Sequence, residues 1–237
     1  MVRRGKKYRE AASQIDRMKA YQPEEAIGLV KKSAKASFDE TVELHLRMGL
    51  DPRNANQQVR GVALLPHGLG KKVRVLVFAQ GESEKIAETA GADFVGGDDL
   101  IKKIEDGWLD FDTAIAIPEM MGKVGKLGKI LGKRGLMPNP KSGTVVAMDN
   151  LPREIEDARK GRVEYKLDRT AIIHVPLGKA SFEESMLMDN LATLIEAVMK
   201  AKPSGAKGQY VKSAYITSTM GPGIKLDLTP TLALTSS

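Results

Sequence analysis

Residues 73–79 (VRVLVFA) are almost all apolar, which is typical of a strand buried on both faces of a parallel sheet. Strand-like and helix-like segments then alternate along the chain. The expected order is helix 82–90, strand 92–96, helix 98–106, strand 111–117, helix 120–135 and strand 144–147. Because parallel strands joined by helices form right-handed crossover units, this part of the chain is predicted to be a parallel α/β unit.

The sequence on either side of this unit has a different pattern. The expected elements are a short amphipathic piece over 13–20, helices from 23 and over 151–160, and strands over 42–50, 59–65, 163–167 and 170–177. A capping box at 181–184 predicts a long helix that stops before Pro203. We interpret the two ends as one discontinuous α+β domain, residues 1–68 and 160–237, interrupted by an α/β domain of residues 69–159.

Glycines mark both connections between these predicted domains. Gly68 and Gly70 lie in the loop 66–72, and Gly161 follows the predicted helix 151–160. Loop residues of this kind are typical of a boundary. We therefore predict that Gly68, Gly70 and Gly161 are hinges.

Net positive charge is concentrated at the two ends of the chain. Residues 1–68 carry 13 basic and 8 acidic side chains, residues 160–237 carry 10 and 7, and the centre carries 14 and 15. With a net charge of +7, this distribution indicates a polyanionic partner for the domain formed by the ends. Lys6 and Arg9, in the basic N-terminal arm, are candidates for that contact, and a solvated tail is the alternative.

The chain has no cysteine, which excludes disulfides, thiolate metal sites and cysteine nucleophiles. His45, His67 and His174 lack metal-type spacing, so neither a metal nor a cofactor is expected. No apolar run follows the basic N-terminus, and no stretch approaches the length of a transmembrane helix. We expect a soluble, cytoplasmic protein without a membrane partner.

The sequence from 209 to 228 (QYVKSAYITSTMGPGIKLDL) alternates like a strand, but hydroxyl groups lie on both of its faces. Ser213, Thr217 and Thr219 precede the turn 220–223 (MGPG). Small hydroxyls, a methionine and accessible backbone suit contact with sugars and phosphates. A plain β-hairpin, with threonine chosen for strand propensity, is the alternative.

The segment 118–145 carries six basic residues and one acidic residue. Its lysines recur between glycines without the spacing of a phosphate-binding loop. This pattern favours a long polyanion over a single phosphate group, and a lysine-solvated helix surface is the alternative. The candidate residues are Lys123, Lys126, Lys129, Lys133, Arg134 and Lys141.

No catalytic arrangement is evident in the sequence. The turn after the first buried strand, residues 80–84, has one glycine and two acidic residues, which would repel the phosphates of a dinucleotide. Acidic pairs elsewhere lie at predicted helix starts, where the helix dipole explains them. We expect that the protein is not an enzyme, and an α/β nucleotide-binding enzyme is the weaker alternative.

Five longer motifs occur in order: FDETVELHLRMGLDPR (38–53), VRGVALLPHGLGKKVRV (59–75), GADFVGGDDLIKKI (91–104), LGKRGLMPNPKSGTV (131–145) and STMGPG (218–223). Together they resemble the bacterial ribosomal protein L one family, the stalk protein of the large ribosomal subunit. The resemblance implies a discontinuous, split β-α-β-like RNA-binding domain with a Rossmann-like three-layer insert that binds no dinucleotide. It also implies a monomer within the ribosome that binds stalk rRNA, exit-site tRNA and the mRNA of its own operon.

Carried over by position, the resemblance implies a set of rRNA-binding residues: Phe38, Lys35, His174, Lys179, Ser213, Thr217, Thr219, Met220 and Gly221. Lysine would neutralise phosphate, hydroxyls would bind phosphate or ribose, and glycine would allow close approach of the RNA backbone. Asp39 and Glu40 cannot contact phosphate favourably, so we expect them to orient their neighbours. A free regulatory RNA-binding protein without a ribosomal role is the rival function.

Overall fold

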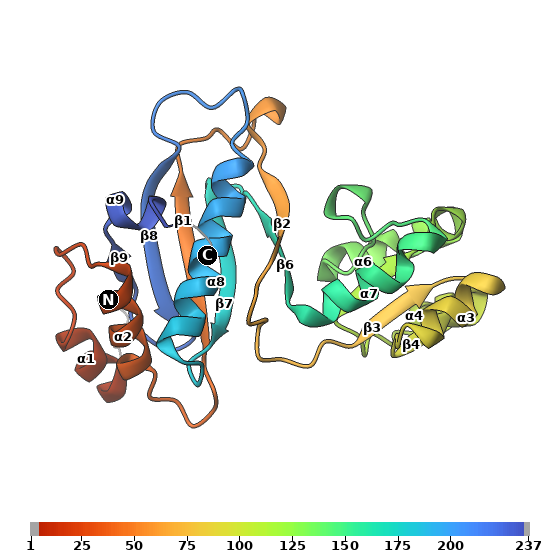
Figure 1. Cartoon of the computed structure of the whole chain (residues 1–237), viewed down its shortest axis with the longest axis horizontal. Helices are drawn as coiled ribbons and strands as arrows, with labels where there is room; N and C mark the ends of the chain where they lie inside the picture. The colour runs from red at the N-terminus through yellow and green to blue at the C-terminus, as the bar shows by residue number, and fades with distance from the viewer. Residues whose placement is uncertain (1–4, 235–237) are drawn as a thin grey trace. The chain divides into compact units, whose positions relative to one another are not determined.

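The computed structural model describes residues 5–234 and divides into two compact units. Unit 1 is formed by both ends of the chain, Met1–Gly70 with Val163–Ser237, and unit 2 is formed by Lys71–Arg162. The fold is mixed α/β, as expected. Within the described residues, unit 1 contains an antiparallel sheet and unit 2 a parallel sheet (Figure 1).

A four-stranded sheet in the order β7-β1-β8-β9 forms the centre of unit 1. Its strands are β1 (Thr41–Met48), β7 (Ile172–Lys179), β8 (Val211–Ser218) and β9 (Ile224–Leu226). Strand β1 pairs antiparallel with β7 on one side and with β8 on the other. The first end of the chain therefore supplies a central strand between partners from the second end.

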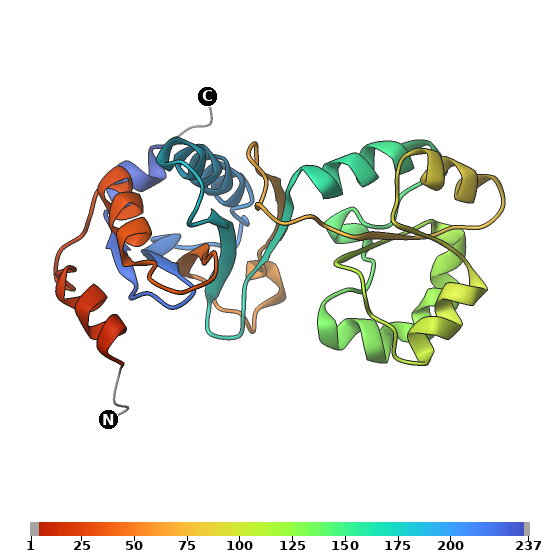
Figure 2. The same ribbon diagram turned by 90° about the horizontal axis from the view of Figure 1, so that it is seen from below.

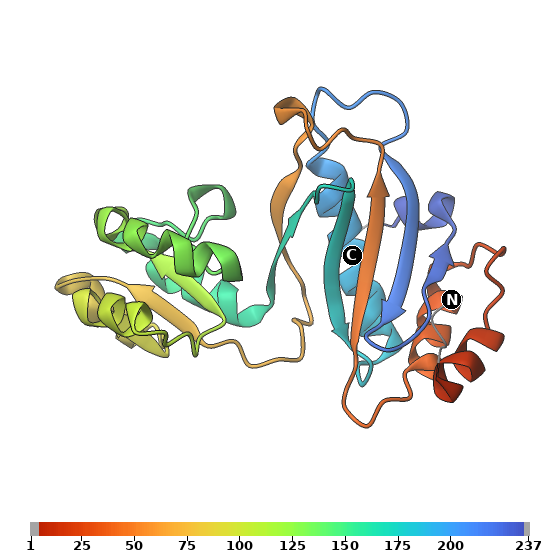
Figure 3. The same ribbon diagram turned by 180° about the vertical axis from the view of Figure 1, so that it is seen from behind.

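Helices cover only one face of this sheet. In Figure 1, α2 (Pro23–Ser33) and α8 (Glu184–Lys200) lie in front of it, whereas Figure 3 shows the opposite face without a covering helix of the described chain. Alternation along β1 sends Leu44 and Leu46 into the core against these helices and leaves His45 on the open face. The remaining elements of unit 1 are α1 (Lys6–Ser13), the 3-10 turn η1 (Ala55–Gln57), α9 (Leu228–Leu232) and the two-stranded ribbon of β2 (Arg60–Leu64) and β6 (Arg162–Lys166).

Unit 2 is built on a parallel sheet in the order β4-β3-β5. Its strands are β3 (Val75–Phe78), β4 (Phe94–Gly96) and β5 (Thr113–Ala116), and β3 is buried along its whole length as its apolar sequence predicts. Helices α3 (Glu82–Thr89) and α7 (Leu151–Lys160) lie on one side of the sheet in Figure 2, and α4 (Asp98–Glu105) lies on the other. The expected fourth strand over 144–147 is reduced to a single bridge between Ala116 and Val145.

The helix expected over 120–135 is interrupted. It consists of η2 (Pro118–Met120), α5 (Met121–Val124), η3 (Gly125–Leu127) and α6 (Gly128–Arg134). Frequent glycines lower helix propensity, so the segment is held mainly by its buried row Val124, Leu127 and Leu131. The 3-10 turns η4 (Pro140–Ser142) and η5 (Met148–Asn150) precede α7.

Two expectations for unit 1 are wrong. The first helix is Lys6–Ser13 rather than a piece over 13–20, because Asp16 accepts a hydrogen bond from Met18 N–H and closes a turn there. The capping box at 181–184 does not form. The Ser181 hydroxyl donates to the Asp39 carboxylate instead, and α8 begins at Glu184 after Glu183.

The first connection between the units is fastened to unit 1 by Asn190, a fully buried residue of α8. Its side-chain oxygen accepts from His67 N–H, and its nitrogen donates to the carbonyls of Gly68 and Leu177. Gly70 has a φ of 68°, and a Cβ there would lie 2.7 Å from the Phe182 ring. Positive φ and close packing account for this glycine without a hinge.

Replacing Asn190 with alanine is expected to remove the partner of one buried and two part-buried backbone groups and to lower the free energy of unfolding by about 3 kcal/mol. Urea unfolding followed by far-UV circular dichroism measures this change. Thr193→Ala on the same helix is the control and should cost less than about 0.5 kcal/mol, because its hydroxyl bonds only to Asp189 O within the helix. An Asn190→Ala midpoint equal to that of Thr193→Ala would contradict the prediction.

Candidate RNA-binding surface

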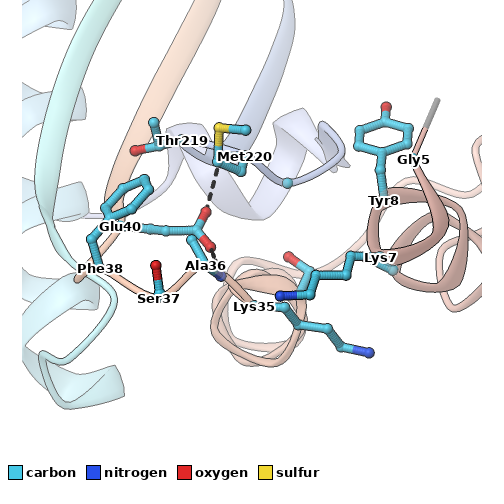
Figure 4. Close-up of a pocket in the computed structure, with 13 residues that line it drawn as sticks. Gly5, Lys7, Tyr8, Lys35, Ala36, Ser37, Phe38, Glu40, Thr219 and Met220 are labelled. Atoms are coloured by element: carbon cyan, nitrogen blue, oxygen red, sulfur yellow. Dashed lines mark hydrogen bonds between the residues drawn. The ribbon is translucent and has the colours of Figure 1, made fainter.

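Two loops of unit 1 are joined by one buried carboxylate. Glu40, only 1% exposed, accepts hydrogen bonds from Ala36 N–H at 2.8 Å and from Met220 N–H at 2.9 Å (Figure 4). The first donor belongs to the loop between α2 and β1, and the second to the turn between β8 and β9. Glu40 therefore fixes the two loops relative to one another.

The charge of Glu40 is stabilised by these donors. Burial raises the pKa of Glu40, but the hydrogen bonds from Met220 N–H and Ala36 N–H outweigh it, and the resulting pKa lies below the ordinary value of 4.5. A second acid, Asp39, accepts from both the backbone N–H and the hydroxyl of Ser181. Both acids thus orient neighbouring segments, as the sequence predicts.

The joined loops present two apolar side chains to solvent. Phe38 is 53% exposed and Met220 is 63% exposed. Both line a groove of about 650 Å³ between these loops and α1, together with Lys7, Tyr8 and Lys35 (Figure 4). Exposed apolar groups on a rigid frame beside cations suit a partner that offers both flat apolar faces and phosphate.

The turn between β8 and β9 uses its hydroxyls internally. The Thr217 hydroxyl lies within hydrogen-bond distance of the carbonyls of Ser218, Gly221 and Pro222. The Thr219 hydroxyl accepts from Thr41 N–H at 3.0 Å and so extends the pairing of the strands. These hydrogen bonds shape the turn and the end of the strand pair, and contact of the same hydroxyls with a ligand stays a prediction.

Gly221 is required by packing inside the protein. A Cβ at this position would lie 2.4 Å from Ser218 Oγ and 3.2 Å from Ser33 Oγ. The turn therefore lies directly on the end of α2, where any side chain would displace it. The sequence suggested that Gly221 allows a ligand to approach the backbone closely. In the structure, the same glycine allows the turn to lie close to Ser33 at the end of α2.

The cations nearest the loops have partners within the protein. Lys35 pairs with Glu10 of α1 at 2.9 Å, and this pair holds the pKa of Glu10 below its ordinary value. Lys179 donates to Thr41 Oγ1 at 3.0 Å and approaches the carbonyl of Asp39. Both lysines are half-buried.

The open face of the sheet carries the other predicted residues. His174 and Ser213 lie there, on β7 and β8. Between them in the sheet is His45, and next to it is Tyr215, which is 40% exposed. Neither His45 nor Tyr215 was predicted to contact RNA. The alternation of side chains along β1 and β8 nevertheless places both residues on the same face as Ser213.

The predicted contact residues thus fall into three groups, and Lys6 and Arg9 form a separate pair. Phe38, Lys35, Thr219, Met220 and Gly221 converge at the groove, and His174, Lys179, Ser213 and Thr217 belong to the open face and its edge. Lys6 and Arg9 are exposed on α1, whose neighbouring residues Lys7 and Tyr8 line the groove and were missed.

The third group belongs to unit 2. Its residues are Lys123, Lys126, Lys129, Lys133, Arg134 and Lys141, all exposed. Lys123 pairs with Asp98, whereas Lys126, Lys129 and Lys133 have no ion pair within residues 5–234. Gly122, Gly125 and Gly132 lie beside them on the exposed side of the segment, and a Cβ at each would meet nothing within 4 Å. We call Lys126, Lys129 and Lys133 the lysine strip.

Two broader features complete the description. Among residues 5–234, no group of three or more histidine, aspartate or glutamate side chains is arranged to hold a metal. No helix of the same range is long and apolar enough to cross a membrane.

Comparison with known proteins assigns this architecture to a family. The model of the Ribosomal protein L1p/L10e family matches residues 30–222. The chain is 66% identical over 228 residues to Large ribosomal subunit protein uL1 of Dehalococcoides mccartyi strains BAV1 and CBDB1, covering 96% of each chain. It is 65% identical over the same length to the protein of that name from strain 195.

The two joined loops, with exposed apolar tips beside cations, belong to a ribosomal protein fold of two units. The family match covers both loops, and this chain belongs to the ribosomal protein L1p/L10e family. The enzyme alternative is set aside by this membership, because the family consists of ribosomal proteins.

Replacing Glu40 with glutamine is expected to destabilise the protein by about 1–3 kcal/mol at pH 7, because one of two charge-assisted hydrogen bonds is lost. The folded-state pKa of Glu40 is lowered, so this stabilisation is complete above pH 4.5 and is lost as the pH falls through the lower folded-state value. Urea unfolding at several pH values compares the wild type with Glu40→Gln, and Glu43→Gln on the adjoining strand β1 is the control. A difference that stays constant down to pH 2 would contradict the prediction.

Proposed function

We propose that the chain is a structural component of the large ribosomal subunit and that unit 1 binds large-subunit rRNA of the mobile stalk. The observation that carries this proposal is the Glu40 bridge, which holds Phe38 and Met220 exposed on one rigid rim. An apolar rim of this kind excludes water around a shaped RNA, and the surrounding cations neutralise its backbone.

The charge distribution supports the same assignment. Both ends of the chain have an excess of basic side chains, and both contribute to unit 1. The relatives from Dehalococcoides mccartyi are named as large-subunit proteins, and they align over 96% of this chain. We propose that the same surface also binds the chain's own operon mRNA, where that RNA folds into a similar shape, and thereby represses translation.

We propose that the two units are the domains of the family. Unit 1 is then the discontinuous RNA-binding domain, and unit 2 is a Rossmann-like insert that binds no dinucleotide. The lysine strip of unit 2 is proposed to contact exit-site tRNA and to assist its release. Because Asn190 binds the Gly68 carbonyl and Gly70 lies close to Phe182, the hinge is proposed to lie after Gly70 on one connection and at Gly161 on the other.

Introducing a negative charge at the rim tests the rRNA site. Met220→Asp is expected to weaken binding of a stalk rRNA fragment at least tenfold, because a carboxylate beside phosphate is repelled and the apolar contact is lost. The measurement is a filter-binding titration of the full chain at a fixed salt concentration.

Met18→Asp is the matched control, because Met18 is 89% exposed and lies outside the groove. It makes the same change of side chain and charge and should alter the affinity by less than about twofold. Equal losses for the two variants would show that net charge alone matters, and the proposed rim would be wrong. Co-sedimentation of the wild-type chain with large subunits separates a ribosomal component from a free regulatory protein.

Removing the lysine strip tests the role of unit 2. A triple variant is expected to bind tRNA more weakly; it combines Lys126→Ala, Lys129→Ala and Lys133→Ala. The slope of the logarithm of the tRNA association constant against the logarithm of the salt concentration should fall by about 0.7–0.9 per lost phosphate contact. Binding of the stalk rRNA fragment should change little. The control combines Lys85→Ala, Lys102→Ala and Lys103→Ala, which removes the same charge from α3 and α4 of the same unit. Identical salt slopes for the two triple variants would contradict the proposal.

A further inference from the structure

Two histidines face each other across strands β1 and β7. His45 and His174 are direct partners in the antiparallel register, although 129 positions separate them in the sequence. Their Nδ1 atoms are 2.8 Å apart, and their ring centroids are 5.0 Å apart. The spacing of the histidines in the sequence did not predict this pair. The register between β1 and β7 brings the two side chains together.

The outer nitrogen of each ring faces a carboxylate. His45 Nε2 lies 3.8 Å from Glu43, and His174 Nε2 lies 3.6 Å from Asp168. Asp168 is itself held in place by Thr170 and by Ile172 N–H. At these distances each carboxylate acts on the ring by charge rather than through a hydrogen bond, and it favours a proton on Nε2, the nitrogen that faces it. The Nδ1 atom of each ring is then the nitrogen that can bind a metal.

Each neutral imidazole ring has one nitrogen that carries a proton and one nitrogen with a free lone pair. In the free protein the two Nδ1 atoms lie within hydrogen-bond distance, so one of them donates and the other accepts.

We propose that His45 and His174 together bind one divalent transition-metal ion, of which Zn²⁺ is the type, through their two Nδ1 atoms. Imidazole is a preferred ligand of such borderline ions, whereas Mg²⁺ and Ca²⁺ prefer oxygen. The ion replaces the proton that the two rings share.

The distances fit this exchange with a small movement. With metal–nitrogen bonds of about 2.0–2.1 Å, a tetrahedral ion holds two nitrogens about 3.3 Å apart, so the pair must open by about 0.5 Å. The His174 side chain is 52% exposed and that of His45 26% exposed, so both rings can tilt and the ion can enter from solvent. Since no third protein ligand gathers there among the described residues, water completes the coordination.

The composition of the chain makes the test unambiguous. It has three histidines and no cysteine. The third histidine, His67, pairs with Asp189 of α8 at 2.8 Å and is the matched control. The inference does not depend on RNA binding, because the free full-length protein is titrated.

Calorimetric titration of the full chain with Zn²⁺ is expected to show one site per molecule. His45→Gln and His174→Gln should each reduce the affinity at least tenfold, and His67→Gln should leave it within about twofold. In nitrogen-15 spectra of the wild-type imidazoles, Zn²⁺ should shift the Nδ1 signals of His45 and His174 and leave those of His67 unchanged. This second measurement needs no variant, so it holds even where a substitution disturbs folding.

Three results would overturn the proposal. One is a zinc isotherm that both His45→Gln and His174→Gln leave unchanged. Another is a spectrum in which only one ring of the pair responds, which would show adventitious binding to a single surface histidine. The third is an equal loss of affinity in His67→Gln.

Discussion

The hydrogen bonds of the Glu40 carboxylate hold together the surface on which the proposed function depends. Glu40 directly precedes β1, and its side chain accepts a hydrogen bond from the backbone of a turn 180 positions later. Without this side chain, two part-buried N–H groups would lose their acceptor, and the link between the turn and the loop would be lost. A residue that cannot itself favour phosphate thus sets the positions of the residues proposed to meet RNA.

Much of the fold could be predicted because its signals are local. The alternation in β1 and the continuous apolar run of β3 identified a one-sided strand and a strand buried on both faces. The helix α2 began at Pro23, where a proline and two acids predict a helix start. Two helix predictions were wrong. Glycines between residues 122 and 135 interrupt the expected helix, although its apolar residues recur with helical spacing. The Ser181 hydroxyl donates to Asp39 instead of capping α8.

The site was less predictable because its contacts join distant segments. The family resemblance placed Phe38, Met220 and Gly221 on one surface. It did not indicate that the Thr217 hydroxyl bonds within the turn or that the Thr219 hydroxyl accepts from Thr41 N–H. His45 and His174 face each other because of the register between β1 and β7. The spacing of residues within one strand does not reveal that register. The pairing of Lys35 with Glu10 likewise depends on where α1 packs.

Because unit 1 is divided between the two ends of the chain, its sheet can be completed only after unit 2 has been synthesised. Unit 2 is contiguous, so its parallel sheet can close as soon as residue 162 has left the ribosome that synthesises it. Strand β1 emerges earlier, yet both of its neighbours, β7 and β8, are synthesised after unit 2. For that interval β1 is a strand with two unpaired edges and an apolar face, which is the form most prone to associate with another chain. Nascent copies are therefore at greatest risk of aggregation between the completion of unit 2 and the arrival of β8.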